Sequence, residues 1–423
     1  MAYSNSGSGA RKAYLESLFQ SAVDAAMPSK CLQGHWPERP TGRIGVLAIG
    51  KAALAMAETA ADFYGWGTQG LILAPHSYVD SRRAITGFEV IEGSHPIPDE
   101  RSVRAADAAL EFVAGLNAND LLLVLLSGGG SAVMCKPGAG VTLAQKQDIS
   151  RRLQDAGATI SELNCVRRQL SAVKGGKLAD ATRARIVTLA ISDVPGDTPS
   201  DISSGPTVDV FETGMNALTV LEQFNVPVER TVLKYLREQA SPEPSVVPDS
   251  ARSFSIAANG STMLEHAESQ LQTDGYRVIS LGARVQGNAR DLAAEHAKQA
   301  LALLKQGGRH CILSGGESTV SIQAHAGIGG RNSEYLLALS IALDGATGIQ
   351  AIACDSDGID GNGTHAGAVI GPDTLEHAAK LGLNPRTYLD SHDSATFFGR
   401  IGDLVVTAPL QTNVNDFRAI LVN

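Results

Sequence analysis

The chain has 423 residues, of which 43% are hydrophobic and 19% are charged, as in an ordinary soluble globular protein. Its net charge of −9 argues against general binding to nucleic acid or to anionic membranes, although local sites can still hold small anions. Because single hydrophobic cores stop growing near roughly 250–300 residues, we expect two or more domains.

The first half alternates helical and strand patterns. Continuous apolar runs of the kind seen in buried strands alternate with stretches of helical periodicity, which indicates a parallel sheet covered on both faces. The expected strands are Ile44–Ile49, Leu71–Ala74, Glu89–Ile91, Leu121–Leu126 and Arg185–Ile191, and the expected helices are Ala13–Ala26, Lys51–Phe63, Arg101–Leu116, Leu143–Gly157 and Ile160–Gln169.

A proline- and serine-rich stretch, Gln239–Ser250, is the best candidate for a domain boundary. It divides the chain into expected domains 1–245 and 250–423, and the second half is again of the α/β class, with antiparallel character around Thr319–Gln323. Its expected strands are Phe254–Ala258, Arg277–Leu281, Cys311–Leu313, Thr319–Gln323, Ile349–Cys354 and Leu404–Ala408, and its expected helices are Thr262–Gln272, Asn288–Gln306 and Arg331–Leu343.

Two apolar strands run directly into Ser-Gly-Gly. The strand Leu121–Leu126 is followed by Ser127–Ser131, and the strand Cys311–Leu313 is followed by Ser314–Ser318. Glycines at the carboxyl end of a strand let backbone N–H groups converge on an anion. The alternative is a pair of tight turns, which are common in α/β proteins. The presence of two such segments favours a cleft that grips phosphate or carboxylate.

Lys51 ends a sequence that superficially resembles a nucleotide-binding P-loop, Gly45-x-x-x-x-Gly50-Lys51. Ala52 stands where the P-loop has the Ser or Thr that holds magnesium, and the intervening residues are strand-like, so we reject a P-loop. A lysine at a helix N-terminus works against the helix dipole unless an anion compensates it. Lys51 is therefore a candidate phosphate ligand, with a solvated surface lysine as the alternative.

Carboxylates follow two further strands. Asp193 is in the polar turn Ser192–Asp197 that follows the strand Arg185–Ile191, a usual place for a metal ligand or a general base in an open α/β sheet. Asp355, Asp357 and Asp360 follow the strand Ile349–Cys354. In an EF-hand calcium loop that began at Asp355, the twelfth position would be Ala366 instead of the usual glutamate ligand. Magnesium held together with substrate phosphate oxygens suits this cluster better. The alternative for both segments is an ordinary polar turn.

Taken together, these segments resemble the glycerate 2-kinase family, the class II glycerate kinases whose C-terminal half is called the MOFRL domain. The resemblance covers nearly the whole chain, with Ser333 at a position where the family often has Gln. The matching motifs are Gly50-Lys51-Ala52, Ser94-His95-Pro96, Pro98-Asp99, Leu126–Ala132, Lys174-Gly175-Gly176-Lys177-Leu178, Ser192–Asp197, Ser203–Pro206, Ser314–Val320, Gly329–Glu334 and Asp357–Gly361.

The resemblance implies ATP-dependent phosphorylation of D-glycerate to 2-phosphoglycerate, with magnesium. It implies two α/β domains, a Rossmann-like N-terminal domain with a parallel sheet and a smaller MOFRL domain, with the active site in the cleft between them. The expected catalytic residues are Lys51, Asp193 and Arg331, and the expected magnesium ligands are Asp193, Asp357 and Asp360. The expected nucleotide-binding residues are Ser127, Gly128, Gly129, Gly130, Ser131, Asn259, Ser314, Gly315, Gly316, Glu317 and Asn332.

Two other functions stay open. Members of this family are often called hydroxypyruvate reductases, but the sequence lacks a Gly-x-Gly-x-x-Gly after a strand with an acidic residue about 20 positions on, which an NAD(P)H site usually needs. A non-catalytic sensor of sugar phosphates could use the same glycine segments. The sequence does not decide which small hydroxy acids are substrates. It also leaves the oligomeric state open between a monomer and an oligomer such as a homodimer.

The expected location is the cytoplasm. The five cysteines are scattered without a Cys-x-x-Cys pair, as expected for reduced thiols in a cytosolic protein. Residues 1–11 are polar and lack the apolar core of a signal peptide, and no run approaches the ~18 apolar residues of a membrane helix. We therefore expect a small-molecule substrate and neither a nucleic-acid nor a membrane partner.

Overall fold

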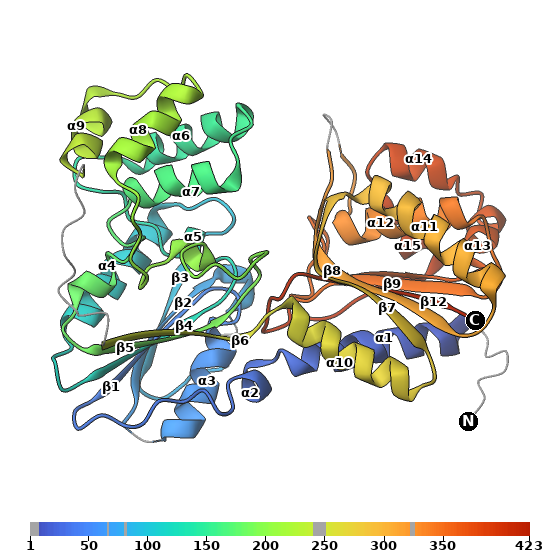
Figure 1. Cartoon of the computed structure of the whole chain (residues 1–423), viewed down its shortest axis with the longest axis horizontal. Helices are drawn as coiled ribbons and strands as arrows, with labels where there is room; N and C mark the ends of the chain where they lie inside the picture. Colours follow the sequence, from blue (N-terminus) through green and yellow to red (C-terminus); the bar gives the residue numbers. More distant parts are fainter. Residues whose placement is uncertain (1–7, 66, 80–82, 240–250, 322–325) are drawn as a thin grey trace. The chain divides into compact units, whose positions relative to one another are not determined.

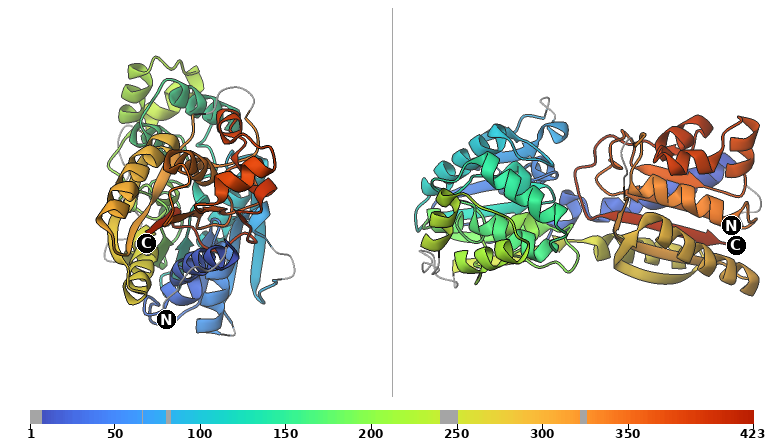
Figure 2. Two further views of the ribbon diagram at one scale, coloured as in Figure 1. Left: turned by 90° about the vertical axis from the view of Figure 1, so that its right-hand side faces the viewer. Right: turned by 90° about the horizontal axis from the view of Figure 1, so that it is seen from above.

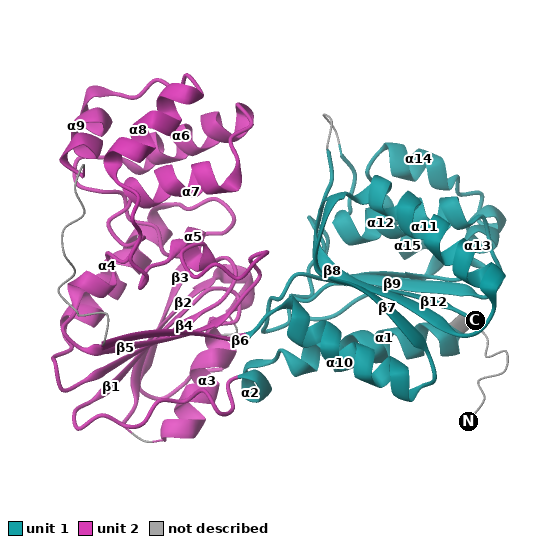
Figure 3. Cartoon of the chain, viewed as in Figure 1, with its two compact units in different colours: residues 1–31, 258–423 teal, residues 32–257 magenta. Residues whose placement is uncertain are grey.

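The computed structural model describes residues 8–65, 67–79, 83–239, 251–321 and 326–423, which form two units (Figure 1, Figure 3). Unit 2 comprises Leu32–Ala257, and unit 1 comprises Met1–Cys31 together with Ala258–Asn423. Most of the proline-rich stretch expected to separate the domains lies outside the described residues. Among the described residues, no helix is both long and apolar enough to span a bilayer.

Unit 2 is built on a six-stranded sheet with the strand order β3-β2-β1-β4-β5-β6. All pairings from β3 through β5 are parallel, which confirms the expected Rossmann-like sheet. β1 and β4 are buried along their whole length because helices cover both faces. The strands are β1 (Ile44–Ile49), β2 (Gln69–Pro75), β3 (Phe88–Gly93), β4 (Leu121–Leu126), β5 (Arg185–Ile191) and β6 (Arg252–Ala258).

The helices of unit 2 fall into two groups. Those that pack against the sheet are α3 (Ala53–Tyr64), α4 (Glu100–Ala114) and α5 (Gly130–Val133). A second group has a hydrophobic core of its own and comprises α6 (Leu143–Asp155), α7 (Ile160–Gln169), α8 (Gly214–Gln223) and α9 (Arg230–Glu238). In the described part of unit 2, short 3₁₀ turns lie at His76–Tyr78, Ala179–Ala181 and Ile202–Ser204.

Unit 1 has a mixed six-stranded sheet in the order β11-β10-β9-β12-β8-β7. β7 and β8 are parallel, whereas β12 runs antiparallel to both of its neighbours. The strands are β7 (Arg277–Asn288), β8 (His310–Thr319), β9 (Ile349–Asp355), β10 (Gly367–Ile370), β11 (Leu404–Val405) and β12 (Asp416–Val422). The central strand β12 was not expected from the sequence.

Helices cover both faces of this sheet, with α1 and α10 on one side and α11 and α12 on the other (Figure 1, Figure 2). The helices of unit 1 are α1 (Ser8–Ala25), α2 (Pro28–Cys31), α10 (Gly260–Thr273), α11 (Ala289–Gln306), α12 (Arg331–Leu343), α13 (Thr374–Lys380), α14 (Pro385–Asp390) and α15 (Ser394–Ile401).

The N-terminal helix α1 packs with the C-terminal part of the chain, although the expected division at 1–245 and 250–423 grouped it with the first sheet. Its apolar stripe is buried there, and Phe19 contacts Phe417 of β12 with ring centroids 5.8 Å apart. The Tyr14 hydroxyl donates to Asp274 over 2.7 Å. Periodicity predicts such a stripe, but it does not say which sheet the stripe covers.

Candidate active site

The loops that follow β1 and β4 lie together at the carboxyl edge of the unit 2 sheet. The strand order reverses between these two strands, and open α/β sheets bind ligands at such a switch point. Lys51 N–H donates to the Gly128 carbonyl over 2.9 Å, so the backbones of the two loops are in direct contact. Lys51 Nζ lies 5.7 Å from the ring centre of Tyr78.

The first Ser-Gly-Gly segment is a strand-to-helix turn, as expected. Ser127 holds it in place, because its hydroxyl donates to the Ile49 carbonyl over 3.2 Å and accepts from Ala52 N–H over 3.0 Å. Gly129 has a φ of 82°, and a Cβ there would lie 3.1 Å from the His95 ring and 3.4 Å from Lys51 Cγ. A side chain at this position would therefore crowd the space between His95 and Lys51.

A second segment supports this turn from behind. Ser203, Ser204 and Gly205 all have left-handed backbone, with φ of 50°, 62° and 59°. Ser203 donates to the Ser127 carbonyl over 3.3 Å, and the Ser204 hydroxyl lies 2.9 Å from that of Ser131. Consecutive left-handed serines are strained, and such strain clusters at functional sites. The sequence motif Ser203–Pro206 gave no indication of this role.

Asp193 lies two residues beyond the end of β5. Since β5 runs parallel to β4, this places Asp193 at the same edge of the sheet as Lys51 and the Ser127–Ser131 turn. Asn259 belongs to unit 1, where its side chain accepts from Thr262 N–H over 3.2 Å and caps α10.

The second Ser-Gly-Gly segment differs from the expectation. It lies inside β8, which continues from His310 to Thr319, and the next helix in the described part of the chain begins only at Arg331. Its glycines are required by the neighbouring strand β7, because a Cβ on Gly316 would lie 2.3 Å from the Val285 carbonyl oxygen. Arg418, a buried side chain of β12, donates to the Gly315 carbonyl over 3.0 Å. A local glycine pattern cannot distinguish such a close strand crossing from a ligand-binding turn.

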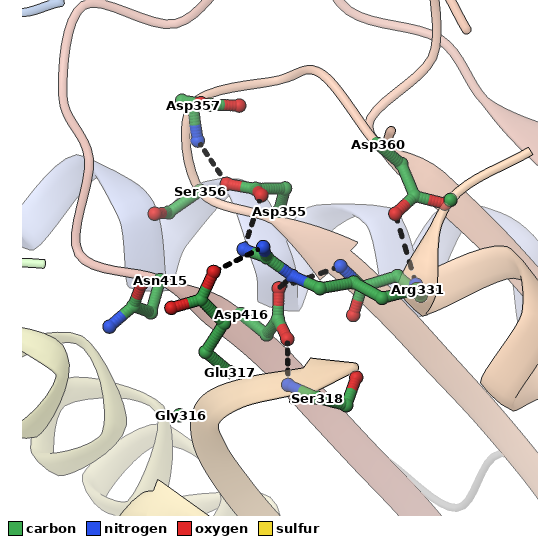
Figure 4. A network of polar contacts seen from close by, with 12 residues as sticks. Gly316, Glu317, Ser318, Arg331, Asp355, Ser356, Asp357, Asp360, Asn415 and Asp416 are labelled. Atoms are coloured by element: carbon green, nitrogen blue, oxygen red, sulfur yellow. Dashed lines mark hydrogen bonds and ion pairs between the residues drawn. The ribbon is translucent and has the colours of Figure 1, made fainter. Parts of the chain in front are cut away.

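Arg331 is the centre of a polar network at the start of α12 (Figure 4). Its Nε donates to Asp416 over 2.8 Å, its Nη1 to Glu317 over 2.7 Å and its Nη2 to Asp355 over 2.8 Å. Asn332 Nδ2 also donates to Asp416, over 2.8 Å. Arg331, Glu317 and Asn332, three expected site residues, are thus brought together.

Charge balance holds this network in one protonation state. Burial favours the neutral acid at Asp416, but the nearby guanidinium groups of Arg331 and Arg418 outweigh it and hold the pKa of Asp416 below its ordinary value. Burial likewise disfavours the charged form of Arg331, and the surrounding carboxylates outweigh it and raise its pKa. The guanidinium therefore stays charged at every physiological pH.

Asp360 is fully buried and caps α12. Its Oδ1 accepts from Asn332 N–H over 3.0 Å, and its Oδ2 accepts from both the N–H and the hydroxyl of Ser333, over 2.9 and 2.7 Å. Asp357 Oδ1 accepts from Ile359 N–H over 2.9 Å. In the part of the chain that the structure describes, no three side chains of His, Cys, Asp and Glu come together as metal ligands.

We expect Asp360→Ala to lower the free energy of unfolding by at least about 1–3 kcal/mol, because it leaves buried donors at the start of α12 unpaired. Urea unfolding measures this, with the exposed Asp390→Ala as the matched control. An Asp360 variant as stable as that control would show that capping is not the role of this carboxylate.

A cavity of about 760 Å³ lies beside the Ser127–Ser131 turn, and its walls include the side chains of Lys146 and Lys174. Sequence reasoning missed both lysines as site residues. A signal was present, because Lys146 is in phase with Ile149 and Leu153 on the apolar face of α6. Lys174 is in the Lys174–Leu178 motif, and the sequence alone did not indicate a function for this motif.

Comparison with known proteins gives two matching family models. Residues 14–237 match a domain of unknown function, DUF4147, and residues 310–416 match the MOFRL family.

Full-length relatives are also found. A putative hydroxypyruvate reductase of Agrobacterium vitis is 42% identical over 96% of this chain and 94% of its own length. A D-glycerate 2-kinase of Thermotoga maritima is 32% identical over 94% of this chain and 95% of its own. The crystal structure of a glycerate kinase from Thermotoga maritima aligns with a TM-score of 0.88 at 30% identity and covers 98% of this chain and all of that one.

Proposed function

The chain belongs to the glycerate 2-kinase family, in which a DUF4147 domain is combined with a MOFRL domain, and on this basis we propose that it transfers a phosphoryl group from ATP to the 2-hydroxyl of D-glycerate. The observation that carries the proposal is the junction of Lys51 with the Ser127–Ser131 turn at the switch point of the unit 2 sheet. We propose the cytoplasm as its location, which the five free thiols support.

The unit 2 site fits a polyanion such as a nucleotide. Gly129 leaves open the space between His95 and Lys51, so phosphate oxygens can approach the backbone there. Phosphoryl transfer asks a protein mainly for positioning and for stabilisation of charge. Lys51 is placed to supply that charge, and the strained support from Ser203 and Ser204 keeps the turn in position.

Asp193 fits both a magnesium ligand and a proton acceptor. Magnesium is commonly held by one or two carboxylates together with phosphate oxygens, so a site with a single protein carboxylate suffices. When bound, magnesium would neutralise charge on the phosphates. We assign Asp193 to accept the proton of the glycerate 2-hydroxyl, because it lies at the same edge of the unit 2 sheet as Lys51 and the Ser127–Ser131 turn.

In the proposed reaction, the 2-hydroxyl oxygen of glycerate forms a bond to the γ-phosphorus. The bond between that phosphorus and the bridging oxygen of ADP breaks, and ADP leaves with the electron pair. The hydroxyl proton passes to the Asp193 carboxylate. Lys51 stabilises the negative charge on the transferring group.

Unit 1 contributes Arg331 to this proposal. Of the five N–H donors of a guanidinium, three bind Asp416, Glu317 and Asp355. Within the described residues, the two remaining donors have no partner, and we propose that they bind a carboxylate or phosphate oxygen of the ligands. The Oδ1 atom of Asn332 is buried and accepts no hydrogen bond from the described residues, so it is a second polar group suited to a ligand.

A reductase is the second candidate, since a relative bears that name and unit 2 has the strand order of dinucleotide-binding folds. The turn after β1, however, has Gly50 followed by Lys51 and two alanines, and the residue after β2 is His76 where an NAD site needs an acidic residue for the ribose. The residues therefore favour the kinase. Measuring NADH oxidation with hydroxypyruvate and glycerate phosphorylation with ATP on one preparation distinguishes the two.

We expect Asp193→Asn to lower kcat much more than it raises KM for glycerate, because an amide cannot accept the hydroxyl proton or bind magnesium well. The measurement is steady-state kinetics with glycerate varied at saturating ATP. A variant with normal kcat and a raised KM would make Asp193 a binding residue and remove it from the chemistry.

A further inference from the structure

The walls of the 760 Å³ cavity in unit 2 are strongly cationic. Lys146 comes from α6, Arg167 from α7, and Lys174 from the segment after α7. Among the described residues that line it, the one carboxylate is Asp148, which binds Arg152 over 2.6 Å and also pairs with Arg151. Together these side chains give the cavity a positive potential, which favours anions.

The two lysines are buried without an ionic partner. Their exposed fractions are 4% for Lys146 and 3% for Lys174, and neither forms an ion pair with a carboxylate of the described residues. Lys146 Nζ donates to the Leu170 carbonyl over 3.3 Å, and Lys174 Nζ donates to the Ser131 carbonyl over 2.7 Å and to the Ser131 hydroxyl. An ammonium has three donors, so each has at least one left.

Two arginines of the same unit, by contrast, are paired with carboxylates. Arg168 binds Asp201 over 3.0 Å and also pairs with Glu212, and Arg252 binds Asp180 over 3.1 Å. Burial of an unpaired charge is costly and is normally avoided. Burial lowers the pKa of Lys174 to about 7 and of Lys146 to about 8. The charge of Arg167 lowers both pKa values further, and the charge of Lys146 also lowers the pKa of Lys174. A bound anion would remove this penalty.

We infer that this cavity seats the polyphosphate chain of the nucleotide, with Lys146 and Lys174 as phosphate ligands. The inference rests on the proposed kinase function, and it extends the nucleotide site from the Ser127–Ser131 turn to α6 and α7. The connection is direct, because Gly129 and Ser131 also line the cavity.

The size and chemistry of the cavity favour a nucleoside triphosphate over glycerate. Cavities of roughly 300–1,000 Å³ hold drug-sized ligands, whereas glycerate has only seven heavy atoms and one negative charge. The cavity wall also includes Pro96, Ile97 and Pro98, an apolar surface suited to a base or a ribose. Several cations together match several phosphates better than one carboxylate.

The test is calorimetric binding of the β,γ-imido analogue of ATP with Mg²⁺, without glycerate, to the full chain and to Lys146→Met and Lys174→Met. We expect each variant to bind about 10- to 100-fold more weakly, the usual effect of losing one hydrogen bond to a charged group. The control is Lys234→Met on α9, whose side chain is 77% exposed, and its affinity should stay within about twofold of the wild type.

Thermal unfolding of the same variants serves as the control for correct folding. The depressed lysine pKa values mean that the folded protein binds fewer protons than the unfolded chain, in which lysine has a pKa of about 10.4. These lysines therefore reduce stability most below about pH 7, and the reduction fades as the pH rises towards 10. Both Met variants should melt at or above the wild-type temperature at pH 6, so weakened binding would not reflect unfolding.

A second readout is proton uptake. The cations Arg167 and Arg168 lie near Lys174, and Arg167 also lies near Lys146. The other ionisable side chains on the cavity wall are His95, Cys135, Asp148 and Arg151. Phosphates that bind the ammonium groups raise their pKa, so the wild type should take up protons on binding at pH 8. Titrations in Hepes and in Tris, which differ in ionisation enthalpy, measure this uptake, and both Met variants should reduce it.

The outcomes separate this inference from the proposed function. Wild-type affinity in both Met variants would overturn the inference while leaving glycerate phosphorylation intact. Binding of inorganic phosphate in the cavity without binding of the analogue would also overturn it. Loss of analogue binding in the variants would support the inference. If the wild type at the same time phosphorylated an acceptor other than glycerate, only the proposed substrate would be contradicted.

Discussion

Lys51→Ala should lower kcat for glycerate phosphorylation by about 10²–10³ while leaving the fold intact, because one preorganised charge that stabilises the transition state typically contributes that much. Lys51 stands at the junction of the β1 and β4 loops, and its backbone contact with Gly128 does not depend on the side chain. The measurement is kcat with saturating ATP and glycerate, together with circular dichroism and thermal unfolding.

The matched control is Lys234→Ala, which removes an exposed lysine from the same unit and should leave kcat unchanged. A folded Lys51→Ala enzyme with a kcat within a few fold of the wild type would contradict the assignment of the switch point as the active site. Recovery of kcat by Lys51→Arg would show that any cation is enough at this position.

Arg331→Lys should also lower kcat/KM by about 10² or more, although it keeps the positive charge. The guanidinium binds three carboxylates through three different nitrogens, and an ammonium is a point charge that cannot reproduce this fork. The change should therefore misplace Asp416 and Glu317 as well as remove a ligand contact. We expect lower thermal stability too, since a buried network loses its central donor.

Because stability also falls, activity is measured at a temperature where circular dichroism shows the variant to be folded. Arg386→Lys, an exposed arginine of the same unit, is the control and should behave as the wild type. If the folded Arg331→Lys enzyme keeps normal kcat/KM, the proposal that Arg331 binds the ligands is wrong.

The sequence predicted the first sheet well because its signals are local. β1, β4 and β5 occur where continuous apolar runs predicted them, and the strand-to-helix turn at Ser127–Ser131 has the expected form. The same reasoning failed for Ser314–Ser318, where glycines serve a close crossing of β7 and β8. Only the tertiary partner of a glycine distinguishes these two uses.

Long-range pairing explains the remaining differences. β12 lies at the centre of the second sheet, yet nothing in its short sequence indicates that it separates β8 from β9. Lys146 was missed for a different reason: it is in phase with the apolar face of α6, but a lysine in a helix normally faces solvent, and only the packing of α6 shows that this one is buried. The roles of Lys51, Asp193 and Arg331 remain predictions, now with the neighbours that mutations can test.

The most direct test of the account is product analysis after incubation of the purified enzyme with D-glycerate, ATP and Mg²⁺, using ³¹P NMR to identify the phosphorylated position. We predict stoichiometric ADP and 2-phosphoglycerate. Formation of 3-phosphoglycerate would contradict the account. So would the absence of any phosphorylated product if the enzyme instead reduces hydroxypyruvate with NADH.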